Sequence, residues 1–243
     1  MKNLFRADMR RILRAKSLYI CSVLSILWIL WGILREIINQ GENATGYISG
    51  VTKSLGSGLE ALLIVFPVFY AVFAHELSSK SMQCVLGHGI TRDKLVLTKF
   101  LDAAALIVGI YLVITVVVLG CADSSLGISD RQMRQLVIFV WLRGLRHFGY
   151  IVFSAAIMFL ANSASAGIVA CVAFSFVFQL VFELIEIFTG YSVSDYTFDG
   201  MLDWAYDAIE AGAFPWQPVP AVGYMAAAVI VTILFFRRKE FEF

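Results

Sequence analysis

The sequence predicts an all-α, polytopic membrane protein with six membrane-spanning helices. Hydrophobic residues make up 60% of its 243 residues, charged residues only 15%, and the mean hydropathy is +0.81. Six apolar runs each approach the length of about 20 residues that a helix needs to cross a bilayer. A monomer of this composition would not stay soluble in water, so a bilayer is its expected environment.

The six runs lie within one expected transmembrane domain that covers residues 1–243. We expect the spans at 18–34, 55–74, 100–121, 136–160, 167–189 and 218–236. The second run is the least regular, because Glu60 and Pro67 interrupt it. The first run follows a basic segment, as in a signal peptide, but no small-residue cleavage site comes after it. We therefore expect it to remain as the first span.

Residues 1–17 are predicted to form an interfacial amphipathic helix. On a helix, the apolar side chains of this segment fall near one another and its arginines surround the other side. The apolar set is Leu4, Phe5, Met9, Ile12 and Leu13, and the basic set is Arg6, Arg10, Arg11 and Arg14. Such a helix lies in the plane of the membrane surface.

The distribution of lysine and arginine predicts the orientation. Segments 1–17, 75–99 and 237–243 lie on one side of the six spans and hold 13 of the 19 basic residues. An excess of basic residues marks the cytoplasmic side of a membrane protein. We therefore expect both termini in the cytoplasm and the chain in the cytoplasmic membrane.

The two long segments on the opposite side differ in character. Segment 35–54 is expected as a polar, glycine-containing loop. Segment 190–217 has no lysine or arginine but carries five acidic residues, Asp195, Asp199, Asp203, Asp207 and Glu210. Apolar residues recur opposite them at helical spacing, namely Phe198, Met201, Leu202, Ala205 and Ile209. This pattern predicts a short external amphipathic helix that lies on the outer membrane surface or re-enters it.

Segment 75–99 is the largest polar interruption on the basic side. Residues 76–86 can form about three helical turns. Gly87 and Gly89 then break the helix, and Thr91 can cap the next one. Three basic residues open that second piece, Arg92, Lys94 and Lys99. We expect two helical pieces that meet at a glycine elbow; an ordinary basic loop is the alternative.

Two arginines and two glutamates inside the fourth and fifth spans are predicted to form an ion-pair ladder. An unpaired charge at the bilayer centre costs at least ~2.5–3.5 kcal/mol, so partners are needed. The tight turn between these spans makes them antiparallel neighbours, with Arg146 level with Glu183 and Arg143 level with Glu186. The three-residue spacing keeps each set on one helix face. A structural clamp is the simpler interpretation, and a substrate-contacting or proton-handling site is the alternative.

Three further ionisable residues fall within spans or at their ends. His147 is expected to be a hydrogen-bonded interior residue, because no second His or Cys lies at metal-ligand spacing. Glu60 and Asp102 lie near opposite ends of their spans, where they could reach the water among the headgroups.

Several kinds of chemistry are absent from the sequence. The four cysteines form no CxxC pair, so neither a metal site nor a disulfide framework is predicted. There is no GxxxxGK[ST] loop, so the chain itself is expected to bind no nucleotide or other cofactor and not to be an enzyme. The basic residues cluster at membrane edges and not in a patch with aromatic residues, which argues against nucleic-acid binding.

Four features resemble the membrane-spanning permease subunits of ABC-2 type ABC transporters, over nearly the whole chain. The basic amphipathic start FRADMRRILRAKSLYI runs into span one, and the basic end reads FRRKEFEF. Glu76 follows span two, and a Gly-Ile-Thr-Arg turn at 89–92 precedes Lys99, similar to the family's E…G-x-x-R…K pattern. The polar segment between spans five and six is similar to the family's external re-entrant region.

The resemblance implies a dimer of permease chains, homo- or heterodimeric, with two copies of a separate ATPase subunit that bind ATP and Mg²⁺. The loop between spans two and three would rest on the ATPase as a coupling helix, with Lys99 holding the helix that follows. Its implied contact residues are Glu76, Leu77, Met82, Val85, Leu86 and Arg92. Small bacterial family members act in antimicrobial-peptide export and resistance. The implied substrate is therefore amphipathic, a peptide antibiotic such as a lantibiotic or a lipid-like molecule.

Other classes of function stay open. A secondary transporter or channel could use the intramembrane Arg/Glu/His cluster for ions or protons, although such folds usually contain repeats or paired broken helices, which the sequence lacks. A scaffold or sensor without transport is a further alternative. Co-purification with an ATPase would favour the permease, and transport driven by a proton gradient without ATP would favour the secondary transporter.

Overall fold

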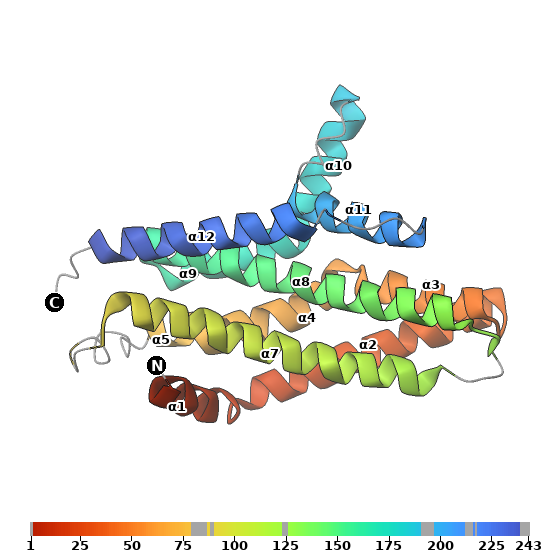
Figure 1. The fold of residues 1–243 in the computed structure, drawn as a ribbon, viewed down its shortest axis with the longest axis horizontal. Coiled ribbons are helices and arrows are strands. Elements are labelled where there is room, and N and C mark those ends of the chain that lie inside the picture. Colours follow the sequence, from red (N-terminus) through yellow and green to blue (C-terminus); the bar gives the residue numbers. More distant parts are fainter. Residues whose placement is uncertain are drawn as a thin grey trace.

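The described chain is helical and contains no strand (Figure 1). The computed structural model describes residues 2–78, 87, 90–122, 126–190, 197–211, 216 and 218–238. The α-helices in chain order are α1 (Lys2–Ile12), α2 (Lys16–Gln40), α3 (Ala44–Leu55), α4 (Gly58–Phe69), α5 (His75–Ser78), α7 (Arg92–Cys121), α8 (Asp130–Ala161), α9 (Ala164–Val172), α10 (Phe178–Thr189), α11 (Phe198–Glu210) and α12 (Pro218–Arg238). Two π-helical segments, η1 (Tyr70–Ala74) and η3 (Ala173–Val177), join α4 to α5 and α9 to α10.

Five of the described helical stretches are long and apolar enough to cross a membrane. They are Lys16–Gln40, Gly58–Leu77, Arg92–Cys121, Asp130–Ala161 and Pro218–Arg237. A sixth results if Ala164–Val177 and Leu180–Phe188, which meet at an angle of 51°, form one span. The apolar helices indicate a membrane protein. Predicted runs 18–34, 100–121, 136–160 and 218–236 lie within four of these stretches, and runs 55–74 and 167–189 overlap the second stretch and the bent pair.

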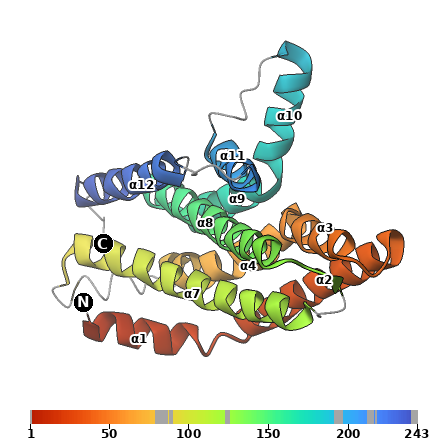
Figure 2. The same ribbon diagram turned by 45° about the vertical axis from the view of Figure 1, so that its right-hand side comes forward.

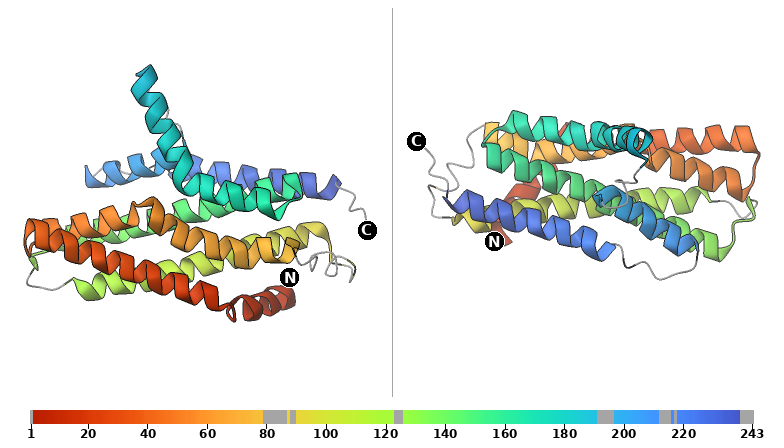
Figure 3. Two further views of the ribbon diagram at one scale, coloured as in Figure 1. Left: turned by 180° about the vertical axis from the view of Figure 1, so that it is seen from behind. Right: turned by 90° about the horizontal axis from the view of Figure 1, so that it is seen from above.

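The helices form an elongated bundle from which α10 projects (Figures 1 and 2). The start of α1 and the end of α12 lie at the same end of the bundle in all views (Figure 3). We call this end, which also holds α5 and the start of α7, the basic end. It brings together the basic residues of segment 1–17 and those that open α7.

The polar loop predicted at 35–54 is instead largely helical, because α2 continues to Gln40 and α3 packs back along it. Two glycines permit this close contact. A Cβ atom on Gly50 would lie 2.6 Å from Ile33 Cα, and one on Gly32 would lie 1.7 Å from Ser54 Oγ. Small residues at a helix interface let two backbones approach closely. The prediction was wrong because it treated the glycines of 35–54, Gly50 among them, as loop formers.

The second span begins at Gly58, slightly later than predicted, because Ser57 starts a new helix there. The Ser57 side chain accepts a hydrogen bond from the Glu60 backbone N–H at 3.3 Å, which is an N-cap interaction. Pro67 lies inside α4, and the π-helical turn η1 begins three residues later. Proline removes a backbone donor, and wider turns of this kind re-satisfy the groups that it frees.

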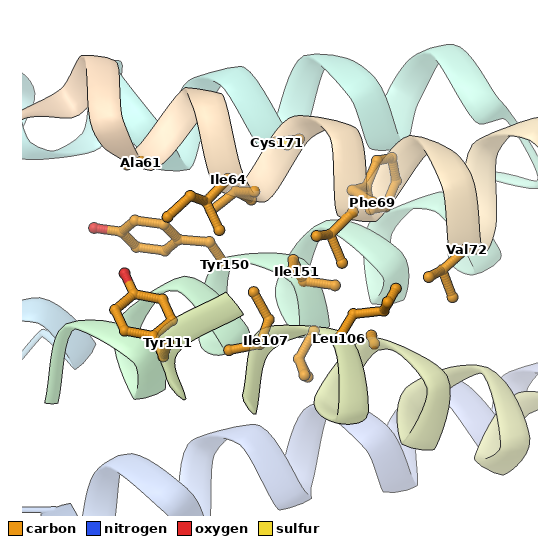
Figure 4. Close-up of a cluster of buried hydrophobic side chains, with 14 of the residues drawn as sticks. Ala61, Ile64, Phe69, Val72, Leu106, Ile107, Tyr111, Tyr150, Ile151 and Cys171 are labelled. Atoms are coloured by element: carbon orange, nitrogen blue, oxygen red, sulfur yellow. The ribbon is translucent and has the colours of Figure 1, made fainter. Parts of the chain in front are cut away.

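The centre of the bundle is formed by α4 with η1 and by α8. Buried side chains of α4, among them Ile64 and Phe69, face Leu106 and Ile107 of α7 and Ile151 of α8 (Figure 4). In contrast, α2, α7 and α12 carry large apolar side chains on the outer surface of the bundle. A surface of this kind suits contact with lipid tails.

Candidate functional site

A buried network of charged side chains holds three helices together at the basic end. Lys99 Nζ of α7 lies 2.6 Å from Glu76 Oε1 of α5 and 2.7 Å from Asp8 Oδ2 of α1. Arg11 of α1 pairs with the same Glu76 oxygen. The side chain of Lys99 is only 1% exposed, and its ammonium group is paired with these two carboxylates. The network joins the amphipathic N-terminal helix to both ends of the 75–99 loop.

Asp102 extends this network by one turn of α7. It lies three residues after Lys99, on the same helix face, where the charges of Lys99, Asp8, Glu76 and Arg11 act on it. Its side chain is 0% exposed, and neither carboxylate oxygen has a hydrogen-bond partner among the described residues. The prediction that Asp102 reaches headgroup water was therefore wrong.

The start of α7 also holds the end of α12. Arg92 Nη1 donates to the backbone carbonyls of Phe236 at 3.1 Å and Arg237 at 3.2 Å. Arg237 Nε in turn donates to Asp93 Oδ1 at 2.6 Å. Cations at a helix C-terminus hydrogen-bond to its free carbonyls and interact favourably with the negative end of the helix dipole. Span three and the last span are thus tied together at the basic end.

The residues predicted to contact an ATPase do not share one surface in the structure. Glu76 is only 5% exposed and lies inside the charge network, so its carboxylate faces α1 and α7. Leu77 packs against the core, and Arg92 holds α12. Thr91 stands at the predicted N-cap but makes no side-chain cap bond. The remaining predicted contacts, Met82, Val85 and Leu86, lie outside the described residues.

A second charged cluster lies between α8 and α11. Arg146 Nη2 lies 2.6 Å from Asp203 Oδ1 and donates to the Asp199 backbone carbonyl at 3.0 Å. Arg143 Nη2 lies 3.1 Å from the same Asp203 oxygen, and Tyr150 Oη donates to Asp199 Oδ2 at 2.9 Å. Burial raises the pKa of the Asp199 carboxyl, although Arg146 and the Tyr150 hydroxyl act in the opposite direction. Two arginines of α8 therefore hold α11 against the bundle.

Helix α11 is the amphipathic helix that the 190–217 pattern predicted. Thr197 caps it by accepting a hydrogen bond from Gly200 N at 3.1 Å. The Phe198 ring lies against Gly149 of α8, where a Cβ atom would be only 2.2 Å from the ring. Further along, Tyr206 packs on Phe139 with ring centroids 4.7 Å apart. Apolar contacts and ion pairs thus dock α11 on the same helix.

The ladder predicted between the fourth and fifth spans did not anticipate these partners. The ion pairs described for Arg143 and Arg146 go to α11, whereas α10, which carries Glu183 and Glu186, turns out of the bundle (Figure 2). The ladder assumed a straight helix after the turn, but η3 and a bend of 51° interrupt it. The side chain of Glu183 lies outside the described residues, so its pairing stays a prediction.

His147 is a hydrogen-bonded interior residue, as predicted. Its Nδ1 lies 2.6 Å from Tyr111 Oη of α7, and its Nε2 lies 3.4 Å from Glu60 Oε2 of α4. Glu60 was expected near headgroup water, but it is 0% exposed. The N-terminal turn of α4 lies against α8 and not at the surface of the bundle, which explains this error.

An aromatic cavity of about 300 Å³ lies beside α11. It is bounded by α8, η3, α10, α11 and α12. Its aromatic lining residues are Tyr150, Phe153, Phe174, Phe178, Phe182, Phe198 and Tyr224. Phe174 and Phe178 stack with centroids 4.7 Å apart. Cavities with mostly apolar walls and few polar groups suit apolar parts of small molecules.

The fold and these clusters define an all-helical membrane protein with buried charge networks. Within the described ranges, no group of three or more His, Cys, Asp or Glu side chains could hold a metal ion. A scan against protein-family models finds no match, and a search of curated proteins finds no matching sequence.

Proposed function

We propose that the chain is the permease subunit of an ABC-2 type transport system that moves an amphipathic substrate across or out of the cytoplasmic membrane. The observation that supports this most is the pairing of Lys99 with Glu76 and Asp8. It ties the two ends of the 75–99 loop to each other and to α1. A loop anchored in this way can pass a force from a partner protein into two spans at once.

The route of that force follows from the contacts. Glu76 lies in α5, which is continuous with η1 and α4 and so belongs to the second span. Lys99 lies in α7, the third span. Arg92 links α7 to α12 through the carbonyls of Phe236 and Arg237. Movement of the loop would therefore displace three spans, those formed by α4, α7 and α12. In this proposal the basic end faces the cytoplasm, where positively charged segments are favoured.

The energy would come from a separate ATPase subunit in two copies, which would bind ATP and Mg²⁺. In this proposal Met82, Val85 and Leu86 contact the ATPase, while Glu76 and Lys99 position the loop from inside the bundle. A second permease chain, identical or different, would complete the complex. The aromatic cavity would receive the apolar part of the substrate, a peptide antibiotic or a lipid-like molecule.

The experiment is co-expression of the chain with each candidate P-loop ATPase subunit of its own organism, followed by purification in lipid nanodiscs. We expect the two proteins to co-purify and ATP hydrolysis to rise when an amphipathic peptide antibiotic is added. Leu86→Glu should weaken ATPase binding, whereas Ile38→Glu, at an exposed position outside the predicted span 18–34 and far from the loop, should not. Normal ATPase binding and transport by Leu86→Glu would contradict the assignment of the loop.

A secondary transporter or channel is the second candidate. The observation that favours it is the buried contact between Glu60 and His147, since titratable pairs inside a bundle can carry protons. Proteoliposomes that contain the chain alone separate the two functions. Substrate movement driven by a proton gradient without ATP would support this candidate, and movement that needs both the ATPase and ATP would support the permease.

A further inference from the structure

Glu60 is a buried carboxylate that neither the basic-end network nor the α11 cluster uses. It lies in the first turn of α4, its side chain has no exposed surface, and neither oxygen has a hydrogen-bond partner in the described part of the chain. An ionised carboxylate in this place would lose its hydration and gain little in return beyond the long approach of His147 Nε2 at 3.4 Å, which is very costly. The neutral acid is therefore the favoured form of Glu60.

His147 gives that acid a partner for proton exchange. Its Nε2 lies 3.4 Å from Glu60 Oε2, and its Nδ1 lies 2.6 Å from the Tyr111 hydroxyl. When Tyr111 donates to Nδ1, the neutral imidazole carries its hydrogen on Nε2, directed at Glu60. A further proton can then reside on the Glu60 carboxyl. The three side chains come from α4, α8 and α7 and enclose one proton position between them.

The charges around Glu60 come from α7 and α8. The charged and titratable groups that act on it or contact it are Tyr111, Arg143 and His147, and Arg146 in turn acts on Tyr111 and His147. Other helices that pack on α4 contribute uncharged groups, Trp28 of α2, which donates to Ser57 Oγ at 3.0 Å, Cys171 of α9 and Ser175 of η3. Lys53 of α3 is held by Glu36 at 2.9 Å. Arg143 is the positive group that acts directly on Glu60.

Arg143 lies between the Glu60 site and α11. Its Nη2 is 3.1 Å from Asp203 Oδ1, and the same atom would be 3.8 Å from a Cβ placed on Gly56, which ends α3 four residues before Glu60. Its guanidinium also stacks over the Phe139 ring at 4.8 Å. An ionised Glu60 would compete with Asp203 for this guanidinium. The position of Arg143 thus links the charge of Glu60 to the docking of α11.

We propose that Glu60, His147 and Tyr111 form a buried proton-binding site whose occupancy controls how tightly α11 docks. With the proton bound, Glu60 is neutral and Arg143 stays on Asp203. When the proton leaves for solvent, the Glu60 carboxylate draws Arg143 away and α11 loosens, although Arg146 still holds it. Asp199 and Phe198 of α11 line the aromatic cavity, so the proton also controls access to that cavity. This inference does not depend on an ATPase partner.

Infrared difference spectroscopy on the full chain in nanodiscs tests the proton site. At neutral pH, Glu60→Gln should remove the carbonyl stretch of one protonated carboxylic acid. His147→Gln should shift that band without removing it, because it changes the neighbour of the acid. If a folded Glu60→Gln protein loses no such band, the proposal is overturned. Should Glu60→Gln fail to fold, an unshifted band in His147→Gln overturns it instead.

Hydrogen exchange tests the link to α11. After correction for the chemical exchange rate, the amides of 198–210 should exchange several-fold faster above the pH at which the Glu60 band disappears. Glu60→Gln should abolish this pH dependence. Asp102→Asn is the matched control, since it removes another fully buried carboxylate, and it should keep the dependence. The same pH dependence in wild type and in Glu60→Gln would overturn the link.

Discussion

Lys99 Nζ lies 2.6 Å from Glu76 Oε1, although 23 residues separate the two in the chain. They stand at the two ends of the 75–99 loop, so one buried contact sets the geometry of both ends. Asp8 of α1 binds the same ammonium group at 2.7 Å. A buried network of this kind is costly to break one partner at a time, because the remaining charges stay buried without compensation.

Lys99→Met tests how much that network contributes to the stability of the fold. Removal of the ammonium leaves Asp8 and part of the Glu76 charge uncompensated, so we expect the free energy of unfolding to fall by ~3–5 kcal/mol. Lys94→Met is the control, because Lys94 is exposed on the same helix, and its effect should stay within about 0.5 kcal/mol. Denaturant unfolding in detergent measures both. Equal effects in the two variants would contradict a structural role for the network.

Much of the fold could be predicted because span length and hydropathy are local properties. The amphipathic helix α11 was also predictable, since Phe198, Leu202 and Ala205 recur at helical spacing within a single segment. Helix α3 was not predictable, because a glycine such as Gly50 is equally typical of a loop and of a tight helix–helix interface. Only the close approach of Ile33 distinguishes the two, and that contact is tertiary.

The site was less predictable for the same reason. The E…G-x-x-R…K pattern identified Glu76 and Lys99, but nothing in it shows that they contact each other or that Asp8 completes the network. The acidic segment without lysine or arginine was the available signal for partners of Arg143 and Arg146. The ladder prediction did not consider this acidic segment, because it assumed that the fourth and fifth spans form a straight helix hairpin. In the structure, α10 leaves the bundle after η3.

Gly149→Ala tests the docking of α11 on α8. The added methyl carbon would lie 2.2 Å from the Phe198 ring, so the ring and the start of α11 must move. Overpacking of this kind costs about 1–3 kcal/mol, which should exceed the gain in helix propensity. We expect faster proteolysis within α11 and lower stability.

Gly109→Ala is the matched control for this change. Gly109 lies inside α7, and a Cβ atom there meets nothing within 4 Å. The substitution should leave the proteolysis of α11 unchanged and be neutral or stabilising by up to about 1 kcal/mol. Similar proteolysis of α11 in both alanine variants would show that Gly149 does not mark its docking site.

Phe174→Ala tests the aromatic cavity as the substrate site of the proposed permease. Phe174 stacks on Phe178 and lies 6.2 Å from the Tyr150 ring, so its loss removes a wall of the cavity. Each aromatic contact is worth about 0.5–1.5 kcal/mol. The peptide concentration for half-maximal ATPase stimulation should therefore rise by up to roughly tenfold. Phe235→Ala, at an exposed position on α12, should leave that concentration unchanged, and equal shifts would exclude the cavity.

Two double-mutant cycles decide which carboxylates Arg146 binds in the membrane. Arg146 Nη2 is 2.6 Å from Asp203 Oδ1, but Asp203 is 49% exposed, which weakens the pair. We expect Arg146→Gln and Asp203→Asn to show a coupling energy of about 1 kcal/mol in unfolding experiments. Arg146→Gln with Glu183→Gln should show coupling near zero, since α10 leaves the bundle. A larger coupling with Glu183 would mean that α10 straightens onto α8 in lipid and that the predicted ladder forms there, with α11 released from its arginines.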